Sequence, residues 1–122
     1  MSSQPGLDTS FAMPRDYLRP CLLLALAEDT AHGYELLDRV AELGLAKVDP
    51  GRLYRCLRVM DAEGLIESHW EPSTLGPARR TYTVTEAGRE SLDEAAALLE
   101  QVAQAIEAFH RRHRRASGRR ST

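Results

Sequence analysis

The sequence predicts a mainly α-helical protein that carries a small β-hairpin and ends in a long helix. Three observations indicate this class. Helical apolar periodicity recurs between residues 14 and 64, β-favouring runs flank a Gly-Pro pair at residues 76–77, and a heptad-like apolar repeat follows residue 85. With 122 residues, 43% of them apolar and 28% charged, the chain fits one globular domain with a modest core.

The first two helices are predicted from apolar periodicity and capping signals. Residues 1–13 are polar and contain Pro and Gly, so we expect a disordered N-terminal arm. Residues 14–29 read as a helix whose regular part begins near Pro20, because proline is tolerated only in the first helical turn. Thr30 is expected to cap a second helix. His32, at its start, is interpreted as a capping or packing residue.

The third predicted helix combines an apolar face with an arginine-rich one. Asp49 is a good N-cap, Pro50 suits the first helical position, and Gly64 can end the helix. Its apolar face consists of Leu53, Leu57 and Met60. Its opposite face carries Arg52, Arg55, Arg58 and Val59. This pattern fits the major groove of DNA, although an ordinary solvated face has the same composition. Tyr54, between the faces, either reaches a phosphate or fills the core.

Two β-favouring runs, residues 65–72 and 79–85, predict a two-stranded hairpin after this helix. Beside a DNA-binding helix, such a hairpin would act as a wing. Arg79 and Arg80 on the second strand would then grip phosphates or enter the minor groove. The alternative is that one of them pairs with Glu67 or Glu71. Together, these elements predict a winged helix-turn-helix domain over residues 14–84.

The C-terminal part is predicted to be a dimerisation helix over residues 85–115, opened by Thr85. Apolar residues recur with the spacing 3, 4, 3, 4, 3, at Leu92, Ala95, Leu99, Val102, Ile106 and Phe109. This seam predicts a homodimer; packing within the same chain is the alternative. Residues 116–122 are expected to form a basic disordered tail, which either follows a phosphate backbone or only increases solubility.

Charge and composition limit the possible functions. The net charge is −2, which is low for a DNA-binding domain, but fifteen of the sixteen basic residues are arginines suited to phosphate and guanine contacts. Cys21 and Cys56 are expected to be reduced thiols, with a redox switch as the alternative. Since neither a catalytic constellation nor metal-ligand spacing is recognisable, we expect no enzymatic activity, no cofactor and no metal. Without an export signal or an apolar run of ~20 residues, a cytoplasmic protein is expected.

Three blocks of the sequence resemble the PadR-type transcriptional regulators: HGYELLDRV, DPGRLYRCLRVMDAEGLIESHWE and GPARRTYTVTEAGRESL. The resemblance implies a bacterial winged helix-turn-helix protein that dimerises through its C-terminal helix and usually represses genes. Carried over by position, the residues at or near DNA are Gly51, Arg52, Tyr54, Arg55 and Arg58, with Arg79 and Arg80 on the wing. The chain departs from the pattern at Arg52, where relatives often have a small hydroxyl residue or Ala.

Some relatives bind aromatic effectors between the long helices and the wing domains. In this chain Tyr17, Trp70 and Phe109 are the aromatic residues that would line such a space, unless they complete the core. The resemblance, together with the arginine-bearing helix and the seam, therefore implies a homodimeric repressor that binds a palindromic operator in double-stranded DNA and is released by a small effector. The alternative is a winged-helix module for protein–protein interaction without DNA binding.

Overall fold

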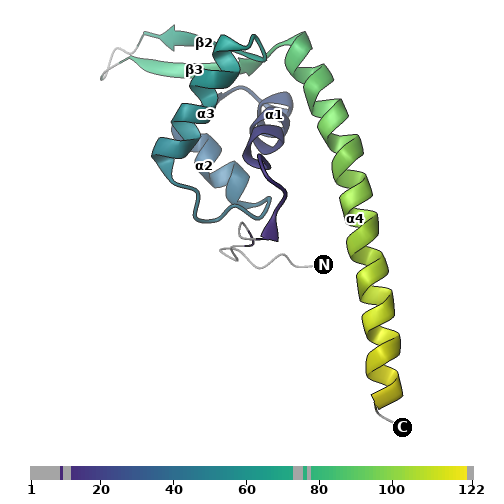
Figure 1. Cartoon of the computed structure of the whole chain (residues 1–122). Helices are drawn as coiled ribbons and strands as arrows, with labels where there is room; N and C mark the ends of the chain where they lie inside the picture. The colour runs from purple at the N-terminus through teal and green to yellow at the C-terminus, as the bar shows by residue number, and fades with distance from the viewer. Residues whose placement is uncertain (1–8, 10–11, 73–75, 77, 121–122) are drawn as a thin grey trace. The chain divides into compact units, whose positions relative to one another are not determined.

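The computed structural model describes residues 9, 12–72, 76 and 78–120 (Figure 1). The elements, in chain order, are α1 (Leu18–Glu28), β1 (Ala31–His32), α2 (Gly33–Ala41), α3 (Pro50–Ala62), β2 (Ile66–Glu71), β3 (Arg79–Val84) and α4 (Glu86–Arg120). The predicted class, mainly helical with a small sheet and a long terminal helix, is confirmed. The chain divides into two compact units, residues 1–92 and 93–122.

In the first unit, helices α1 to α3 pack below the β2–β3 hairpin and enclose the core (Figure 1). The largest fully buried side chains are Leu22, Leu23, Leu36, Val40, Leu53, Leu57, Met60 and Ile66. Pro20 is the third residue of α1, where its missing N–H removes no helical hydrogen bond. The predicted start of the regular helix near Pro20 is therefore correct.

The sheet has three strands in the order β1-β3-β2, all antiparallel, so the prediction of a two-stranded hairpin was incomplete. Strand β1 pairs Ala31 with Tyr82, which buries Ala31 almost completely. Two residues are too few to produce a period-2 pattern in the sequence. The predicted cap at Thr30 was wrong for the same reason: residues 31–32 are a strand, and His32 is the N-cap of α2.

Helix α3 begins and ends as the sequence predicts. The Asp49 carboxylate accepts the backbone N–H of Arg52 at 3.1 Å, and Pro50 is the first helical residue. Gly64 follows the helix with a φ of 80°, a left-handed conformation that glycine adopts without strain. Helix α3 is therefore held with its apolar face in the core and its arginines outside.

Helix α4 is capped by Thr85, as predicted. The Thr85 hydroxyl donates to the Gly64 carbonyl at 2.7 Å and accepts the backbone N–H of Gly88 at 3.1 Å. A Cβ on Gly88 would overlap the carbonyl oxygen of Leu65, so only glycine allows this close approach. Leu92, the first residue of the predicted dimer seam, packs against the core of its own unit.

The ends of the chain differ in part from the prediction. The expected tail at 116–122 was wrong up to residue 120, because α4 continues to Arg120. No proline interrupts this stretch, and Glu107 forms ion pairs with Arg111 and Arg114 that support the helix. Of the predicted disordered arm, residues 1–8 and 10–11 lie outside the described residues, whereas Thr9 hydrogen bonds to the Gly44 carbonyl. Within the described residues, none of the helices combines the length and apolar character of a membrane span.

Candidate nucleic-acid interface

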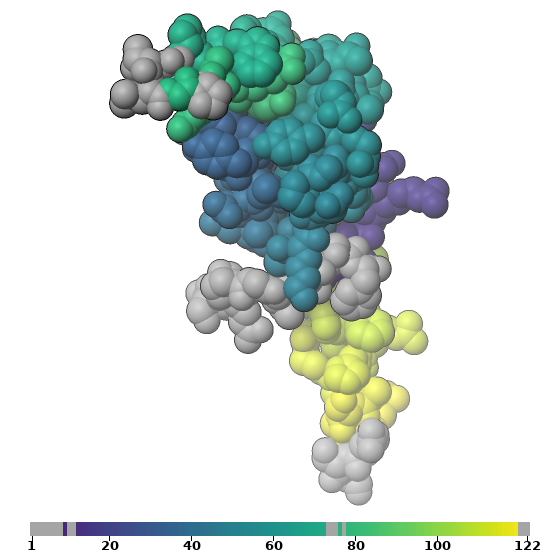
Figure 2. Space-filling model, turned by 90° about the vertical axis from the view of Figure 1, so that its left-hand side faces the viewer, coloured from purple at the N-terminus to yellow at the C-terminus, as the bar shows by residue number. Residues whose placement is uncertain are grey.

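Helix α3 and the hairpin lie next to each other on one face of the molecule, shown in teal and green in Figure 2. The predicted DNA-contacting residues of this helix are all exposed or at the limit of exposure: Gly51, Arg52, Tyr54, Arg55 and Arg58. Their apolar counterparts Leu53, Leu57 and Met60 are fully buried. The structure therefore has the buried apolar face and the exposed arginine-bearing face of α3 that the sequence predicts.

The exposed surface of α3 has two sides. Tyr54 lies beside α2 and β3, where it shares a hollow with Arg80 and Tyr82. Arg52, in contrast, faces the start of α1, where it shares another hollow with Arg19. This separation follows from the turn of about 100° per helical residue. The structure thus does not bring all five predicted residues to a single patch.

Tyr54 packs on the first residue of α2. An ideal Cβ at Gly33 would lie 2.5 Å from Cε1 of Tyr54 and 2.8 Å from its hydroxyl oxygen. The residue is at the limit of exposure, so it is not a core residue, which was one of the two alternatives. Its hydroxyl lies at the N-terminal end of α2, where the helix dipole favours an anion such as a phosphate.

Aromatic rings hold the two hairpin arginines. Arg79 donates to the Tyr34 hydroxyl at 3.2 Å and lies over the ring of that tyrosine, with its Cζ 5.9 Å from the centroid. Arg80 lies over the ring of Trp70, with its Cζ 5.1 Å from the ring centroid, in a cation–π contact. Neither arginine forms an ion pair with a carboxylate of the described residues, so a close pairing with Glu67 or Glu71 is not found. Arg79 does lie opposite Glu71 in the strand register, and its charge adds to the hydrogen bond from His32 in lowering the pKa of Glu71.

His32 connects the start of α2 to the hairpin. Its Nδ1 lies 2.8 Å from Glu35 Oε1 and its Nε2 lies 3.1 Å from Glu71 Oε2. Its ring stacks on Tyr34 with 5.6 Å between centroids, which links this cluster to Arg79. The hydrogen bond to Glu71, reinforced by Glu35, raises the pKa of His32. The sequence reading anticipated the capping role of His32 but missed its contact with the hairpin, since Glu71 is far away along the chain.

From Ala95 to Phe109, the predicted dimer seam of α4 belongs to the second unit, residues 93–122. Ala95, Leu99 and Val102 are half-buried, whereas Ile106 and Phe109 are exposed. Leu98, outside the seam, is 62% exposed. Dimerisation through this helix stays a prediction.

The three aromatic residues predicted for an effector pocket have different surroundings. Tyr17 packs against the core and donates to the Leu43 carbonyl at 2.9 Å; burial, reinforced by the neighbouring Cys21, raises its pKa to about 12. Trp70 is 63% exposed beneath Arg80, and Phe109 is 65% exposed in the other unit. Of the three residues, only Tyr17 packs against the core, which was the alternative to lining a pocket. The effector pocket itself stays a prediction.

Both cysteines are free thiols. Burial raises the pKa of Cys21 to about 11 and also raises that of Cys56. At neutral pH both groups are therefore protonated and weakly nucleophilic, which favours structural thiols over a redox switch.

The three helices and the hairpin define the class of the first unit: it is a winged helix-turn-helix domain. Residues 22–94 match the family model described as "Transcriptional regulator PadR-like family". The chain belongs to this family of transcriptional regulators, which confirms the resemblance seen in the sequence.

Individual relatives agree with this assignment. The chain is 35% identical to transcriptional regulator Rv3488 of Mycobacterium tuberculosis, over 75% of this chain and 84% of that protein. It is similar to the crystal structure of a PadR-like transcriptional regulator from Bacillus cereus, with 32% identity, a TM-score of 0.67 and coverage of 75% of this chain and 89% of that one. A PadR-like transcription factor from Bacteroides fragilis matches with 27% identity and a TM-score of 0.64, covering 75% and 88% of the two chains.

Proposed function

We propose that this protein is a sequence-specific DNA-binding repressor that acts as a homodimer on a palindromic operator. The observation that supports this most is the set of exposed arginines on α3 and β3. Arg52, Arg55, Arg79 and Arg80 form no ion pair with any carboxylate of the described residues. Exposed guanidinium groups that are not held in ion pairs, on a helix beside a hairpin, are suited to phosphates and guanine edges.

The residues have distinct proposed roles. Arg55 and Arg58 lie opposite the buried face of α3 and would enter the major groove, with Gly51 at the helix start allowing close approach of the backbone. Tyr54 would donate to a phosphate near the N-terminus of α2. Arg79 and Arg80 would contact phosphates or the minor groove beside it. Arg52, on the side facing α1, would contribute less to base reading.

The proposed dimer forms through the seam of α4, from Ala95 to Phe109. Two recognition helices would then enter successive major grooves about one turn, ~34 Å, apart. A small effector would act by shifting the population of distances or angles between the two DNA-binding units. Of the three aromatic residues predicted for its pocket, Trp70 and Phe109 stay proposed for it, since Tyr17 packs against the core. Action in the cytoplasm of a bacterial cell follows from this role.

The alternative function, a winged helix that binds only another protein, has one observation in its favour. Residues 1–109 contain ten basic and eighteen acidic side chains, so the body of the protein is acidic. DNA binding then depends on the local placement of the arginines rather than on net charge.

Selection of fragments from the host's genomic DNA by the purified full chain tests the proposal. We expect a few fragments that share an inverted repeat to be enriched strongly by the wild-type protein. The variant Arg55→Ala/Arg80→Ala, with both substitutions at exposed positions, should lose this enrichment while its fold is retained. If no fragment is enriched above random DNA, or if the variant selects the same fragments equally well, the proposed function is wrong.

A further inference from the structure

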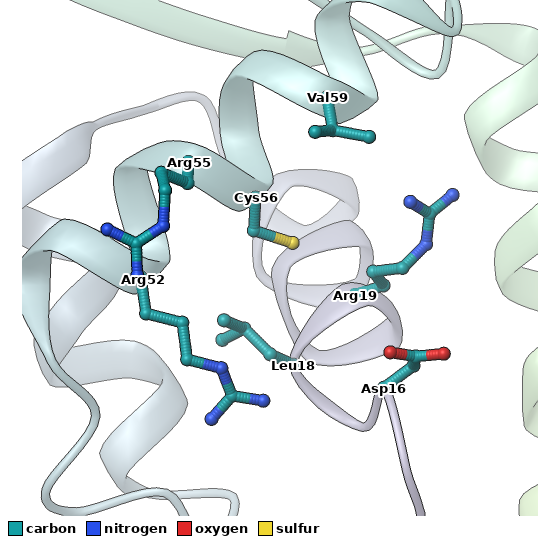
Figure 3. Close-up of a pocket in the computed structure, with 7 residues that line it drawn as sticks. All are labelled: Asp16, Leu18, Arg19, Arg52, Arg55, Cys56 and Val59. Carbon is teal, nitrogen blue, oxygen red and sulfur yellow. The ribbon is translucent and has the colours of Figure 1, made fainter.

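A hollow lies between the start of α1 and the outer side of α3 (Figure 3). Its volume is about 270 Å³, which is enough for a small ligand and too little for a large cofactor. The residues that line it are Asp16, Leu18, Arg19, Arg52, Arg55, Cys56 and Val59. All of them belong to the winged-helix unit.

The positive charges around the hollow are not equally available. Arg19 is neutralised by Glu63, whose carboxylate lies 2.7 Å from its Nη2. The guanidiniums of Arg52 and Arg55 have no ion pair with a carboxylate of the described residues, since Asp49 accepts only the backbone N–H of Arg52. Figure 3 shows these two side chains on the same side of the hollow and Arg19 on the other. One end therefore has two guanidiniums that are not held in ion pairs, although the Asp49 carboxylate lies near that of Arg55 beside Gly51; two such groups are suited to a carboxylate.

The middle of the hollow is apolar. Leu18 is buried and Cys56 is half-buried, and in Figure 3 both lie between Arg52 and Arg19. Val59, at the top of Figure 3, is 50% exposed. It is an apolar residue on a side of α3 that otherwise carries arginines. An aliphatic chain of a ligand would remove the exposed apolar surface of Val59 and Cys56 from water, with Leu18, which is already buried, beneath it.

The far rim limits the charge of a ligand. Asp16 lies there with a φ of 63°, which is rare for a residue other than glycine, and its carbonyl accepts the backbone N–H of Arg19 at 3.1 Å. Left-handed residues that are not glycine occur frequently at binding sites. The Asp16 carboxylate would repel a second anionic group, so a ligand with a single negative charge is favoured over a dianion.

We propose that this hollow binds a small amphipathic monocarboxylate. Its carboxylate accepts hydrogen bonds from Arg52 and Arg55, and its aliphatic chain lies on Leu18, Cys56 and Val59. Because Arg55 is also a proposed DNA contact, an occupied hollow lowers the affinity for DNA; this consequence rests on the proposed function, whereas binding of the carboxylate does not. In this proposal Arg52 is a ligand-binding residue.

Calorimetric titration of the full chain with sodium octanoate, in the absence of DNA, tests the site directly. We expect saturable binding of octanoate, and none of octan-1-ol or acetate, which lack the charge and the chain respectively. Arg52→Gln should weaken octanoate binding about tenfold or more, the loss expected for one charge-assisted hydrogen bond. Val59→Asp should also weaken it, because it places a carboxylate beside the chain. The matched control Arg58→Gln, on the same helix but outside the hollow, should bind octanoate like the wild type.

Each outcome supports or overturns the site. Absence of saturable octanoate binding, equal binding of octan-1-ol, or an unchanged affinity in Arg52→Gln would overturn it. Circular dichroism of each variant shows whether the fold is retained, and all three substituted side chains are exposed. Titration of an operator duplex with and without octanoate then tests the regulatory part. Octanoate binding without any DNA binding would refute the proposed function alone, whereas DNA binding that octanoate leaves unchanged would refute only the competition.

Discussion

The ring of Tyr54 lies directly on Gly33, so that a methyl group at residue 33 would overlap its edge. This contact joins the first residue of α2 to the second turn of α3, and it sets how closely the two helices approach each other. The same tyrosine shares a hollow with the hairpin residues Arg80 and Tyr82. The position of the proposed reading helix relative to the hairpin therefore depends on the absence of a side chain at Gly33.

Gly33→Ala should displace the Tyr54 ring and destabilise the protein by about 1–3 kcal/mol, the range typical of overpacking. Urea unfolding measures this change. Tyr54→Ala in the same background should restore part of the stability, because it removes the overlapping ring. Gly118→Ala is the matched control: no atom lies within 4 Å of its Cβ position, so this change should be neutral or slightly stabilising. A Gly33→Ala protein as stable as the control would contradict the contact.

The cluster around His32 should make stability depend on pH. The hydrogen bond to Glu71 raises the pKa of His32, so the contribution of the protonated imidazole is complete below its ordinary value of 6.5 and is lost as the pH rises through the raised value. Hydrogen bonds from His32 lower the pKa of Glu35 and Glu71, so their contribution is complete above 4.5 and is lost as the pH falls through the lowered values. The cluster should therefore stabilise the fold most between pH 4.5 and 6.5.

Thermal unfolding at pH 5.5 and pH 8 measures this effect. The wild type should lose more stability between the two values than His32→Gln, which cannot be protonated. His69→Gln, at an exposed hairpin histidine whose nearest carboxylate is at 3.8 Å, serves as the control and should keep the wild-type difference. Identical differences for the wild type and His32→Gln would show that the cluster does not contribute.

Arg55→Ala should weaken operator binding by about 1–3 kcal/mol and relax the sequence preference, as expected for loss of a base contact. Fluorescence anisotropy with a labelled operator duplex gives the affinity. Arg89→Ala removes an exposed arginine near the start of α4, which is not among the proposed DNA contacts, and should change the affinity little. An affinity of Arg55→Ala equal to that of Arg89→Ala would mean that α3 is not the reading helix.

Leu99→Glu should give monomers, because it places a charge in the middle of the proposed α4 seam. Sedimentation velocity measures the mass. Leu98→Glu makes the same substitution one residue earlier, at a side chain that is 62% exposed and lies outside the seam, and should leave a dimer. If both variants are dimers, the interface does not lie at the α4 seam. If the wild-type protein is a monomer, the proposed dimer does not exist.

Features encoded in neighbouring residues could be predicted from the sequence, and features that depend on distant contacts could not. Asp49, Pro50 and Gly64 determine the ends of α3 locally, and its apolar period identified the buried face. The strand β1 was missed because its two residues become a strand only by pairing with β3. The His32–Glu71 contact depends on the same pairing, which brings β1 beside the hairpin.

The candidate site, like the fold, could be predicted from the sequence only where it depends on neighbouring residues. The exposed arginines of α3 followed from helical periodicity, but their division into two sides depends on where α1 and α2 pack. Only the folded chain shows that Arg52 and Arg19 line opposite sides of one hollow and that Tyr54 lies on Gly33. The predicted end of α4 at residue 115 was too early, because arginine-rich composition indicates a solvated segment and does not distinguish a helix from a coil.

The salt dependence of operator binding tests the central claim most directly, namely that the arginines of α3 and the hairpin lie against a DNA duplex. The affinity of the wild-type protein for a selected operator should fall steeply between about 50 and 200 mM salt, with a slope of log K against log salt steeper than about −3, since each phosphate contact contributes about −0.9. Arg79→Ala/Arg80→Ala should make this slope shallower by about 2 or more. A slope near zero, or one that the double substitution leaves unchanged, would contradict the account.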